Sequence, residues 1–307
     1  DTMKPAFIRL MQNTTSQFTD GKFDPDKGLD HLSILLDYCQ SRGVTVMFGD
    51  WGGRIVDAKA KTVNEEMIGY AAEYLRFLVE DKGYDCIKFY NLINEPNGYW
   101  STSDGDFDLW SDAMLVMHRK MVENGIAEKV ELVGPDAAIW TPQEARWVTE
   151  TDNKLGDAIG LYDIHTYPSK VTINSGEYTD IISAYKSQVP EGKKIVMGEI
   201  GIKFVEAADS LYNKENIRRA NECSFASKSD SQMFVYDPMY GTDMADAVLQ
   251  TANAGYSGTV AWMLDDAMHT HETRDRLKIW GFWNIFGEEF FGAEQEQVRP
   301  WFYAWSL

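Results

Sequence analysis

The sequence predicts an α/β fold of the (β/α)8 TIM-barrel type, formed by one domain that spans residues 1–307. Short runs rich in β-branched and aromatic residues alternate with longer segments in which apolar residues recur at helical spacing. This alternation is the pattern of repeated βα units. Several short runs are continuously apolar, as is typical of parallel strands that are covered on both faces. No linker, low-complexity segment or short internal repeat divides the chain.

The strand candidates number seven, whereas a closed barrel of this kind has eight. We therefore expect one strand of the barrel to lie outside the given sequence. The seven candidates are 6–11, 44–49, 87–94, 130–134, 159–165, 194–199 and 258–264.

The helices between these strands have recognisable ends. Gly43 follows an apolar periodic segment and favours a helix end, and Asn64 can cap a helix that has acidic residues in its first turn. Pro142 suits the first position of a short helix. The last candidate helix reaches the final residue, so we expect it to continue beyond the given sequence. The helix candidates are 29–42, 64–82, 108–123, a short one from 142, 177–188, 243–253 and 299–307.

The composition restricts the class of partner. The chain has 44% hydrophobic and 25% charged residues, which is sufficient for a globular core. Its net charge of −19 argues against a nucleic-acid partner and is compatible with a neutral substrate. No apolar run has the length of a membrane span. Of the three cysteines, Cys39 and Cys86 lie in apolar periodic segments, where we expect buried free thiols.

Two glutamates directly follow or close apolar strands. Glu95 stands in N-L-I-N-E-P-N (91–97), and Glu199 ends K-I-V-M-G-E (194–199). The C-terminal ends of barrel strands form the active site, and a carboxylate buried there is costly unless it is paired or titrated. Hydrolysis of a glycosidic bond needs two such carboxyl groups. For either glutamate alone, a solvated acid at a strand end is the alternative interpretation.

These motifs resemble clan A of the retaining glycoside hydrolases, and are most similar to its cellulase-like family 5 or a neighbouring family. In that clan the glutamate of Asn-Glu-Pro ends strand four and is the acid/base catalyst, and a glutamate at the end of strand seven is the nucleophile. The resemblance implies these roles for Glu95 and Glu199. It also numbers the seven strand candidates two to eight, which places the missing first strand before Asp1.

Further positions match the family in the same order along the chain. The resemblance implies that Arg9 lies near the nucleophile, that Asn94 binds the sugar 2-hydroxyl, and that His165 and Tyr167 form the strand-six His-x-Tyr pair whose tyrosine contacts the nucleophile. Trp262 matches the strand-eight tryptophan beneath the sugar. The segment G-D-W-G-G (49–53) departs from family 5, which has a histidine shortly after strand three. This departure bears on the substrate more than on the chemistry.

Aromatic residues follow several strand ends and suggest platforms for sugar rings. Those at a strand end or in the loop after it could line the cleft, although loop aromatics also pack against a barrel top. We expect Trp110, Trp147, Trp301 and Trp305, which lie on helices, to be core residues. The candidate substrate-binding residues are Asp50, Trp51, Trp100, Trp140, Trp262, Trp280 and Trp283.

We therefore expect a retaining β-glycoside hydrolase that is endo-acting on a β-linked glucan or mannan, and that needs no cofactor. The alternatives are an exo-acting β-glycosidase of the galactosidase or xylosidase type and a non-catalytic carbohydrate-binding barrel. A secreted, periplasmic or cell-surface location would suit a polysaccharide substrate. No metal site is expected, because His269 and His271 lie in a polar loop without a third ligand.

Overall fold

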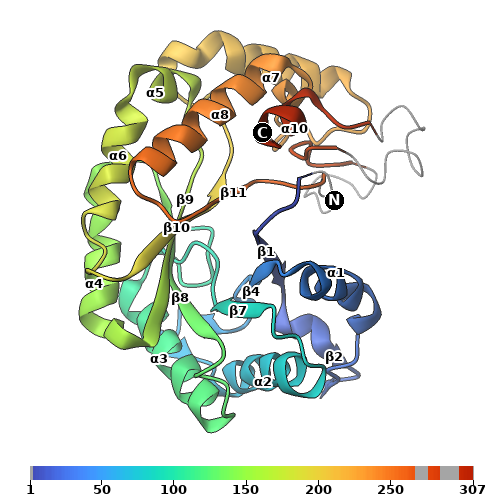
Figure 1. The fold of residues 1–307 in the computed structure, drawn as a ribbon, viewed down its shortest axis with the longest axis vertical. Helices are drawn as coiled ribbons and strands as arrows, with labels where there is room; N and C mark the ends of the chain where they lie inside the picture. The colour runs from blue at the N-terminus through green and yellow to red at the C-terminus, as the bar shows by residue number, and fades with distance from the viewer. Residues whose placement is uncertain (1–2, 267–275, 284–296, 307) are drawn as a thin grey trace. The chain divides into compact units, whose positions relative to one another are not determined.

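The computed structural model describes residues 3–266, 276–283 and 297–306. Its main sheet has seven strands, whose order in the sheet is their order along the chain (Figure 1). This order is that of a (β/α) barrel and confirms the predicted fold class. Each of the seven predicted strands is present. They are β1 (Phe7–Gln12), β4 (Thr45–Asp50), β7 (Ile87–Asn91), β8 (Glu131–Ile139), β9 (Ile159–Thr166), β10 (Lys194–Ile200) and β11 (Thr259–Ala261).

Parallel pairing fixes the register of the first four strands. Phe7 is opposite Thr45, Met47 is opposite Phe89, and Phe89 is also opposite Glu131. Two small antiparallel hairpins, which were not predicted, interrupt the loops that follow β1 and β4. They consist of β2 (Phe18–Thr19) with β3 (Lys22–Phe23), and β5 (Val56–Asp57) with β6 (Thr62–Val63).

Helices connect successive strands, as the alternating pattern predicts. The predicted segment 64–82 is one α-helix continued by a π-helical turn, and the helix predicted at 243–253 begins five residues earlier, after Asp237. The α-helices are α1 (Leu29–Arg42), α2 (Glu65–Arg76), α3 (Phe107–Glu123), α4 (Arg146–Leu155), α5 (Lys170–Ser175), α6 (Glu177–Lys186), α7 (Ser210–Glu222), α8 (Pro238–Asn253) and α10 (Pro300–Trp305). Shorter helical turns are η1 (Thr14–Gln17), η2 (Phe77–Asp81), η3 (Pro142–Ala145), η4 (Gly156–Ala158), η5 (Ala207–Asp209) and η6 (Met233–Tyr236).

Contacts divide the chain into two compact units. Unit 1 comprises Asp1–Lys4, Thr166–Lys186 and Glu199–Leu307, and unit 2 comprises Pro5–His165 and Ser187–Gly198. Two of the four boundaries fall near the C-terminal ends of β9 and β10, and neither unit is a single stretch of sequence. The prediction of one domain stays a prediction.

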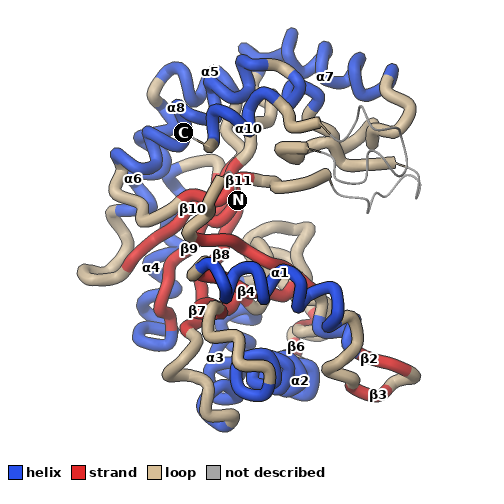
Figure 2. Tube along the Cα trace, turned by 45° about the vertical axis from the view of Figure 1, so that its right-hand side comes forward, coloured by secondary structure: helices blue, strands red, loops and turns tan. Residues whose placement is uncertain are grey.

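The core of unit 2 lies between its strands. Met47, Val133, Leu161 and Val196 come from β4, β8, β9 and β10 and form one cluster whose members are at most 4% exposed. Inward-pointing aliphatic residues of this kind fill the interior of a parallel barrel. On the outer side of the first strands, α1, α2 and α3 lie beside β1, β4 and β7 (Figures 1 and 2).

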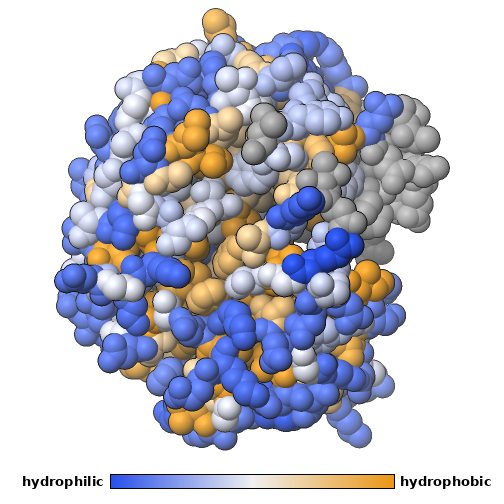
Figure 3. Space-filling model, in the orientation of Figure 1, coloured by the Kyte–Doolittle hydropathy of each residue, from blue (hydrophilic) through white to orange (hydrophobic). Residues whose placement is uncertain are grey.

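The face of the molecule drawn in Figure 3 is largely polar. Hydrophilic residues prevail on this face and hydrophobic residues form scattered patches. Among the described residues, no helix combines the length and the apolar character that a membrane span needs. Cys39 and Cys86 are buried free thiols, as predicted.

In unit 1, a buried ion pair fixes the segment that follows β11. Asp266 and Arg299 are each 3% exposed and pair through both guanidinium nitrogens. The same carboxylate accepts the backbone N–H groups of Trp280 and Gly281 at 2.9 and 2.8 Å. Four donors thus converge on one carboxylate, and this holds the backbone at Trp280 and Gly281 in place.

Replacement of Asp266 by Ala should lower the free energy of unfolding by about 3–5 kcal/mol, because the buried Arg299 charge would lose its partner. Denaturant unfolding followed by circular dichroism measures this loss. The double variant Asp266→Leu with Arg299→Met should recover part of it, since apolar residues can replace a buried pair. A single variant as stable as the wild type would show that water or another group compensates the guanidinium.

Candidate active site

The backbone turns sharply at Glu95, four residues after the end of β7. Glu95 has a left-handed φ of 46°, an unfavourable conformation for a residue with a side chain. Its backbone N–H points to Asp136 Oδ2 at 3.4 Å, and its carbonyl oxygen accepts the N–H of Gly98 at 2.9 Å. These contacts hold a conformation that directs the side chain away from the strand. The strand is therefore shorter than predicted and ends at Asn91 rather than Asn94.

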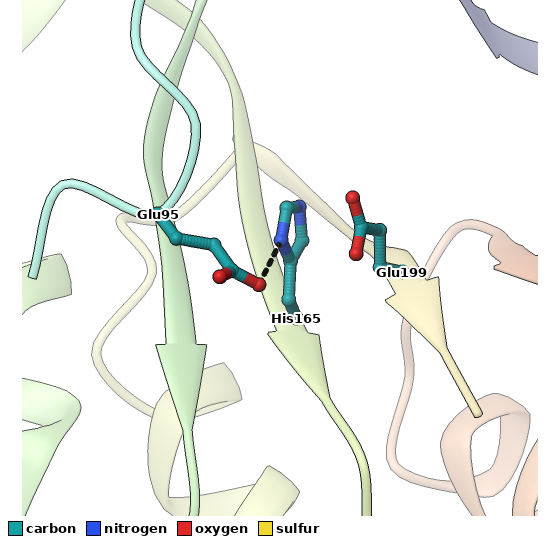
Figure 4. A group of neighbouring side chains, drawn as sticks. All are labelled: Glu95, His165 and Glu199. Atoms are coloured by element: carbon teal, nitrogen blue, oxygen red, sulfur yellow. Dashed lines mark hydrogen bonds and ion pairs between the residues drawn. The ribbon is translucent and has the colours of Figure 1, made fainter. Parts of the chain in front are cut away.

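The Glu95 carboxylate has a partner on each oxygen. Oε1 lies 3.1 Å from Nδ1 of His165 (Figure 4), and Oε2 accepts the indole N–H of Trp100 at 2.6 Å. Burial raises the pKa of the Glu95 carboxyl, but the hydrogen bonds and charge of His165, together with the Trp100 N–H, outweigh it and leave the pKa below its usual value. Glu95 is 8% exposed, so it is a nearly buried carboxylate rather than a solvated surface acid.

Asp136, in β8, is the centre of a buried polar network in unit 2. Its carboxylate accepts from Arg9 Nη2 at 3.0 Å and from Asn91 Nδ2 at 2.9 Å, and lies 3.1 Å from His165 Nε2. Burial would raise the pKa of Asp136, but the Arg9 and His165 charges hold it well below its usual value. Arg9 Nη2 also donates to Asn94 Oδ1 at 2.8 Å, which orients the Asn94 amide.

Asp163 is a second buried carboxylate beside His165, with its Oδ2 3.6 Å from His165 Nε2. It accepts the backbone N–H of Gly198 at 2.6 Å, and a Cβ on Gly198 would lie 2.0 Å from its oxygen, so only glycine fits there. Burial raises the pKa of Asp163 to about 7, although His165 opposes this rise.

Asp136, Asp163 and His165 are the residues of unit 2 best placed to hold a metal, because their ligand atoms lie within 4.8 Å of one another. Arg9 already supplies a positive charge to Asp136, which disfavours a cation in this cluster. His269 and His271 lie outside the described residues.

Glu199 is the last residue of the predicted strand 194–199 and lies within β10, which ends at Ile200 (Figure 4). It belongs to unit 1. It is 4% exposed, and its Oε2 accepts the phenol O–H of Tyr167 at 2.7 Å. Lys203 Nζ lies 4.6 Å from the centroid of the Tyr167 ring, and Trp280 packs edge-on against that ring. The contact between Tyr167 and Glu199 is the one that the His-x-Tyr motif implied.

The candidate tryptophans differ in their surroundings. Trp100 and Trp140 are 46% and 43% exposed and meet edge to face, with ring centroids 5.7 Å apart. Trp280 is only 3% exposed, and Trp283 packs against Phe302 of α10. Trp280 is therefore a packing residue beside Tyr167 rather than an open platform. Trp51 and Trp262 are half-buried, and their contacts with substrate stay predictions.

Asp50 does not present a free carboxylate. The side chain is fully buried and accepts from the backbone N–H and the hydroxyl of Thr14 and from the N–H of Gly52. Burial raises the pKa of Asp50 to about 6, although these donors lower it. The sequence suggested a substrate ligand, but the contacts show a residue that secures the loops after β1 and β4.

The prediction that tryptophans on helices are core residues is confirmed for those that are buried. Trp110, Trp147 and Trp301 are at most 4% exposed. Trp305 is half-buried and packs against Phe282 and Trp301.

The fold is shared with a class of solved structures, the (β/α)-barrel glycoside hydrolases. A β-xylosidase from Caulobacter crescentus is 14% identical, with a TM-score of 0.61 over 100% of this chain and 62% of that chain. A glucosidase from Croceicoccus marinus is 9% identical, with a TM-score of 0.65 over 99% and 60%. An exo-β-1,4-mannosidase from an Opitutaceae bacterium is 12% identical, with a TM-score of 0.61 over 99% and 52%.

The chain thus spans between about half and three-fifths of the length of these three structures. At such identities the likeness concerns the fold. No family model matches the sequence, and neither does any curated protein.

Proposed function

We propose that the chain is a retaining β-glycoside hydrolase in which Glu95 is the acid/base catalyst and Glu199 the nucleophile. The observation that carries the proposal is that two nearly buried glutamates follow or end strands of a sheet whose fold is that of glycoside hydrolases. Each carboxylate has a hydrogen-bonding partner suited to fixing its position, His165 or Tyr167. In a barrel, the C-terminal ends of the strands hold the reacting groups.

The reaction would proceed in two displacements. In the first, Glu199 Oε forms a bond to the anomeric carbon, the glycosidic C–O bond breaks, and the departing oxygen takes the proton of Glu95. In the second, water attacks the same carbon, its proton passes to Glu95, and the bond to Glu199 breaks. The free acid and the carboxylate return to their initial states, and no cofactor takes part.

The contacts of Asn94 suit a role in sugar binding. Since Oδ1 accepts from Arg9, the amide nitrogen of Asn94 is left as the group that can donate to a sugar hydroxyl. We propose that it binds the 2-hydroxyl, and that the bond strengthens as positive charge develops on the sugar ring. We also propose that Arg9 lies near Glu199 and that Trp262 lies beneath the sugar.

The substrate is a β-linked sugar in this proposal, and its length separates two versions. Endo action on a glucan or mannan is supported by the half-exposed pair Trp100 and Trp140. Exo action is supported by the burial of Trp280 and by the solved structures, which include a β-xylosidase, a glucosidase and an exo-mannosidase. Because Trp280 is buried by packing and is not an open platform for a sugar, we favour exo action.

Hydrolysis assays test the proposal directly. Aryl β-glucoside, β-mannoside, β-xyloside and β-galactoside should distinguish the sugar, and β-glucans and mannans should distinguish the mode of action. An exo enzyme releases single sugars from the start, whereas an endo enzyme first releases oligosaccharides of mixed length. Sugar binding without turnover of any substrate would instead favour a non-catalytic carbohydrate-binding barrel.

We further propose a secreted, periplasmic or cell-surface location, because polymeric substrates lie outside the cell. Fractionation of cells that produce the native protein tests this, and recovery in the cytosolic fraction would contradict it.

A further inference from the structure

The Trp100 indole donates to the carboxylate oxygen that an acid catalyst needs. Its Nε1 lies 2.6 Å from Glu95 Oε2, and His165 Nδ1 lies 3.1 Å from Oε1. Hydrogen bonds donated to a carboxylate favour its ionised form over the protonated one. Protonation of a departing sugar requires the opposite form. The Trp100 contact therefore favours the carboxylate, and Oε2 can hold a proton for a leaving group only when the indole N–H has moved away.

Of the two partners of Glu95, Trp100 is the one with room to move. His165 has no exposed surface, and its second ring nitrogen lies 3.1 Å from Asp136. Trp100 is 46% exposed, and its neighbour Tyr99 is 83% exposed. A side-chain rotation therefore suffices to part the indole from Glu95, whereas displacement of His165 would disrupt a buried network.

The loop that carries Trp100 is anchored on both sides of this ring. The Asn97 amide bonds the backbone of Ala138 through both its nitrogen and its oxygen, at 2.6 and 2.9 Å. Ser101 donates to the Asn94 carbonyl at 3.1 Å. Between these anchors the indole folds over Gly98 so closely that a Cβ there would lie 2.3 Å from the ring. The loop is therefore shaped to bring the indole N–H to Glu95.

The exposed surface of this ring is continued by a second indole. Trp140 is 43% exposed and meets Trp100 edge to face. Aromatic surface of this kind suits the C–H face of a sugar. Because Trp100 contacts the proposed acid catalyst, a sugar stacked on this pair would lie where the proposed reaction has its leaving group.

We propose that Trp100 is a positioning residue that couples occupation of the leaving-group subsite to the acid form of Glu95. A sugar that stacks on Trp100 and Trp140 draws the indole N–H away from Oε2, and this oxygen is then free to hold the proton. When the leaving group departs, the indole returns and favours the carboxylate that activates water. The inference rests on the proposed function and adds a control of its proton transfer.

The other charged groups near Glu95 in unit 2 are the same in the wild type and in every variant of Trp100. His165 of β9 contacts it directly, and Asp136 of β8 faces its backbone N–H. Arg9 of β1 and Asp163 of β9 lie behind these two residues. A difference between the wild type and a variant of Trp100 therefore reports the indole contact and not these groups.

The pH profile of kcat/KM on a substrate with a poor leaving group tests the coupling. Trp100→Phe keeps a ring but removes the N–H, which raises the pKa of Glu95 and should move the basic limb to higher pH. Gly98→Ala displaces the indole without altering it and should move the limb in the same direction. Trp140→Phe makes the same chemical change away from Glu95 and should leave the limb in place. A purely structural role of Trp100 would lower activity at every pH without moving the limb.

A second measurement is independent of activity. The indole N–H resonance of Trp100, assigned by its loss in Trp100→Phe, should titrate with Glu95 in the wild type and not in Glu95→Gln. Added D-glucose, D-mannose or D-xylose should shift it, and Trp140→Ala should weaken that response about tenfold, as expected for the loss of one aromatic contact.

The outcomes separate the two proposals. A basic limb that stays in place in both Trp100→Phe and Gly98→Ala overturns the coupling and leaves the proposed function intact. Full hydrolysis by Glu95→Gln overturns the proposed function. If the wild type hydrolyses nothing, a resonance that ignores all three sugars overturns the coupling as well.

Discussion

Replacement of Glu199 by Gln should abolish turnover of every substrate, activated or not. The amide is nearly isosteric but cannot attack the anomeric carbon, so the covalent intermediate cannot form. A loss on the order of 10⁴-fold or more in kcat is expected, which is the scale observed when a catalytic nucleophile is removed. Steady-state hydrolysis of an aryl β-glycoside measures it. The fold of the variant should be intact, because Gln can still accept the Tyr167 O–H.

Azide supplies the sharpest control for this role. In Glu199→Gly, added azide occupies the space of the missing carboxylate and should attack an activated substrate to give the α-glycosyl azide. Tyr167→Phe is the matched milder variant, because it removes the hydrogen bond to Glu199 at 2.7 Å and leaves the carboxylate in place. Substantial turnover by Glu199→Gln would exclude Glu199 as the nucleophile.

The strands could be predicted because short runs rich in β-branched and aromatic residues alternate with segments of helical spacing. Each of the seven predicted strands is present in the main sheet, and the differences lie at their ends. β8 extends five residues beyond its predicted end, because Pro135 and Asp136 interrupt the apolar run although the strand continues to Ile139. β11 is shorter than predicted and ends at Ala261.

Some helices lacked a usable pattern. In α7 only Ala220 is buried, so no apolar stripe marks Ser210–Glu222. The short helix α5 has only two buried residues, too few to establish a period. Helical spacing is informative only where one face is covered.

The two glutamates could be found from their positions at strand ends, but their partners could not. Asp136 was not among the predicted site residues, and nothing in the sequence places Arg9, Asn91 and His165 around it. A polar residue inside the long apolar strand 131–139 was the available signal. The bond between Trp100 and Glu95 depends on a left-handed residue and on Gly98, which spacing alone does not show.

The contacts of Asp50 could not be predicted for a related reason. An acid at a strand end has two uses, to face a ligand or to secure the adjacent loops, and the sequence does not distinguish them. Thr14 supplies two donors to Asp50 from a distant part of the chain. Burial of the acid follows from that contact and could not be predicted locally.

Replacement of Glu95 by Gln should have an effect that depends on the leaving group. Gln cannot donate a proton, so substrates with poor leaving groups should lose about 10²–10⁴-fold in kcat/KM, the usual contribution of general acid catalysis. Aryl glycosides with acidic phenols need little protonation and should keep most of their first step. Their second step still lacks its base, so the glycosyl-enzyme should accumulate and appear as a burst of phenol. Stopped-flow absorbance measures the burst, and mass spectrometry of the quenched protein detects the added sugar.

The stereochemistry with azide then distinguishes Glu95 from Glu199. In Glu95→Ala the covalent intermediate still forms, and azide should attack it from the side that water normally takes, which gives the β-glycosyl azide. The anomer is opposite to the one expected for Glu199→Gly, because the two glutamates flank opposite faces of the anomeric carbon. The same anomer from both variants, or equal losses on good and poor leaving groups in Glu95→Gln, would contradict the assignment of the two roles. His165→Ala is the informative third variant. It removes the partner of Oε1 and leaves Trp100 on Oε2. It should therefore alter the pH profile of hydrolysis without changing which glutamate is the nucleophile and which is the acid/base catalyst.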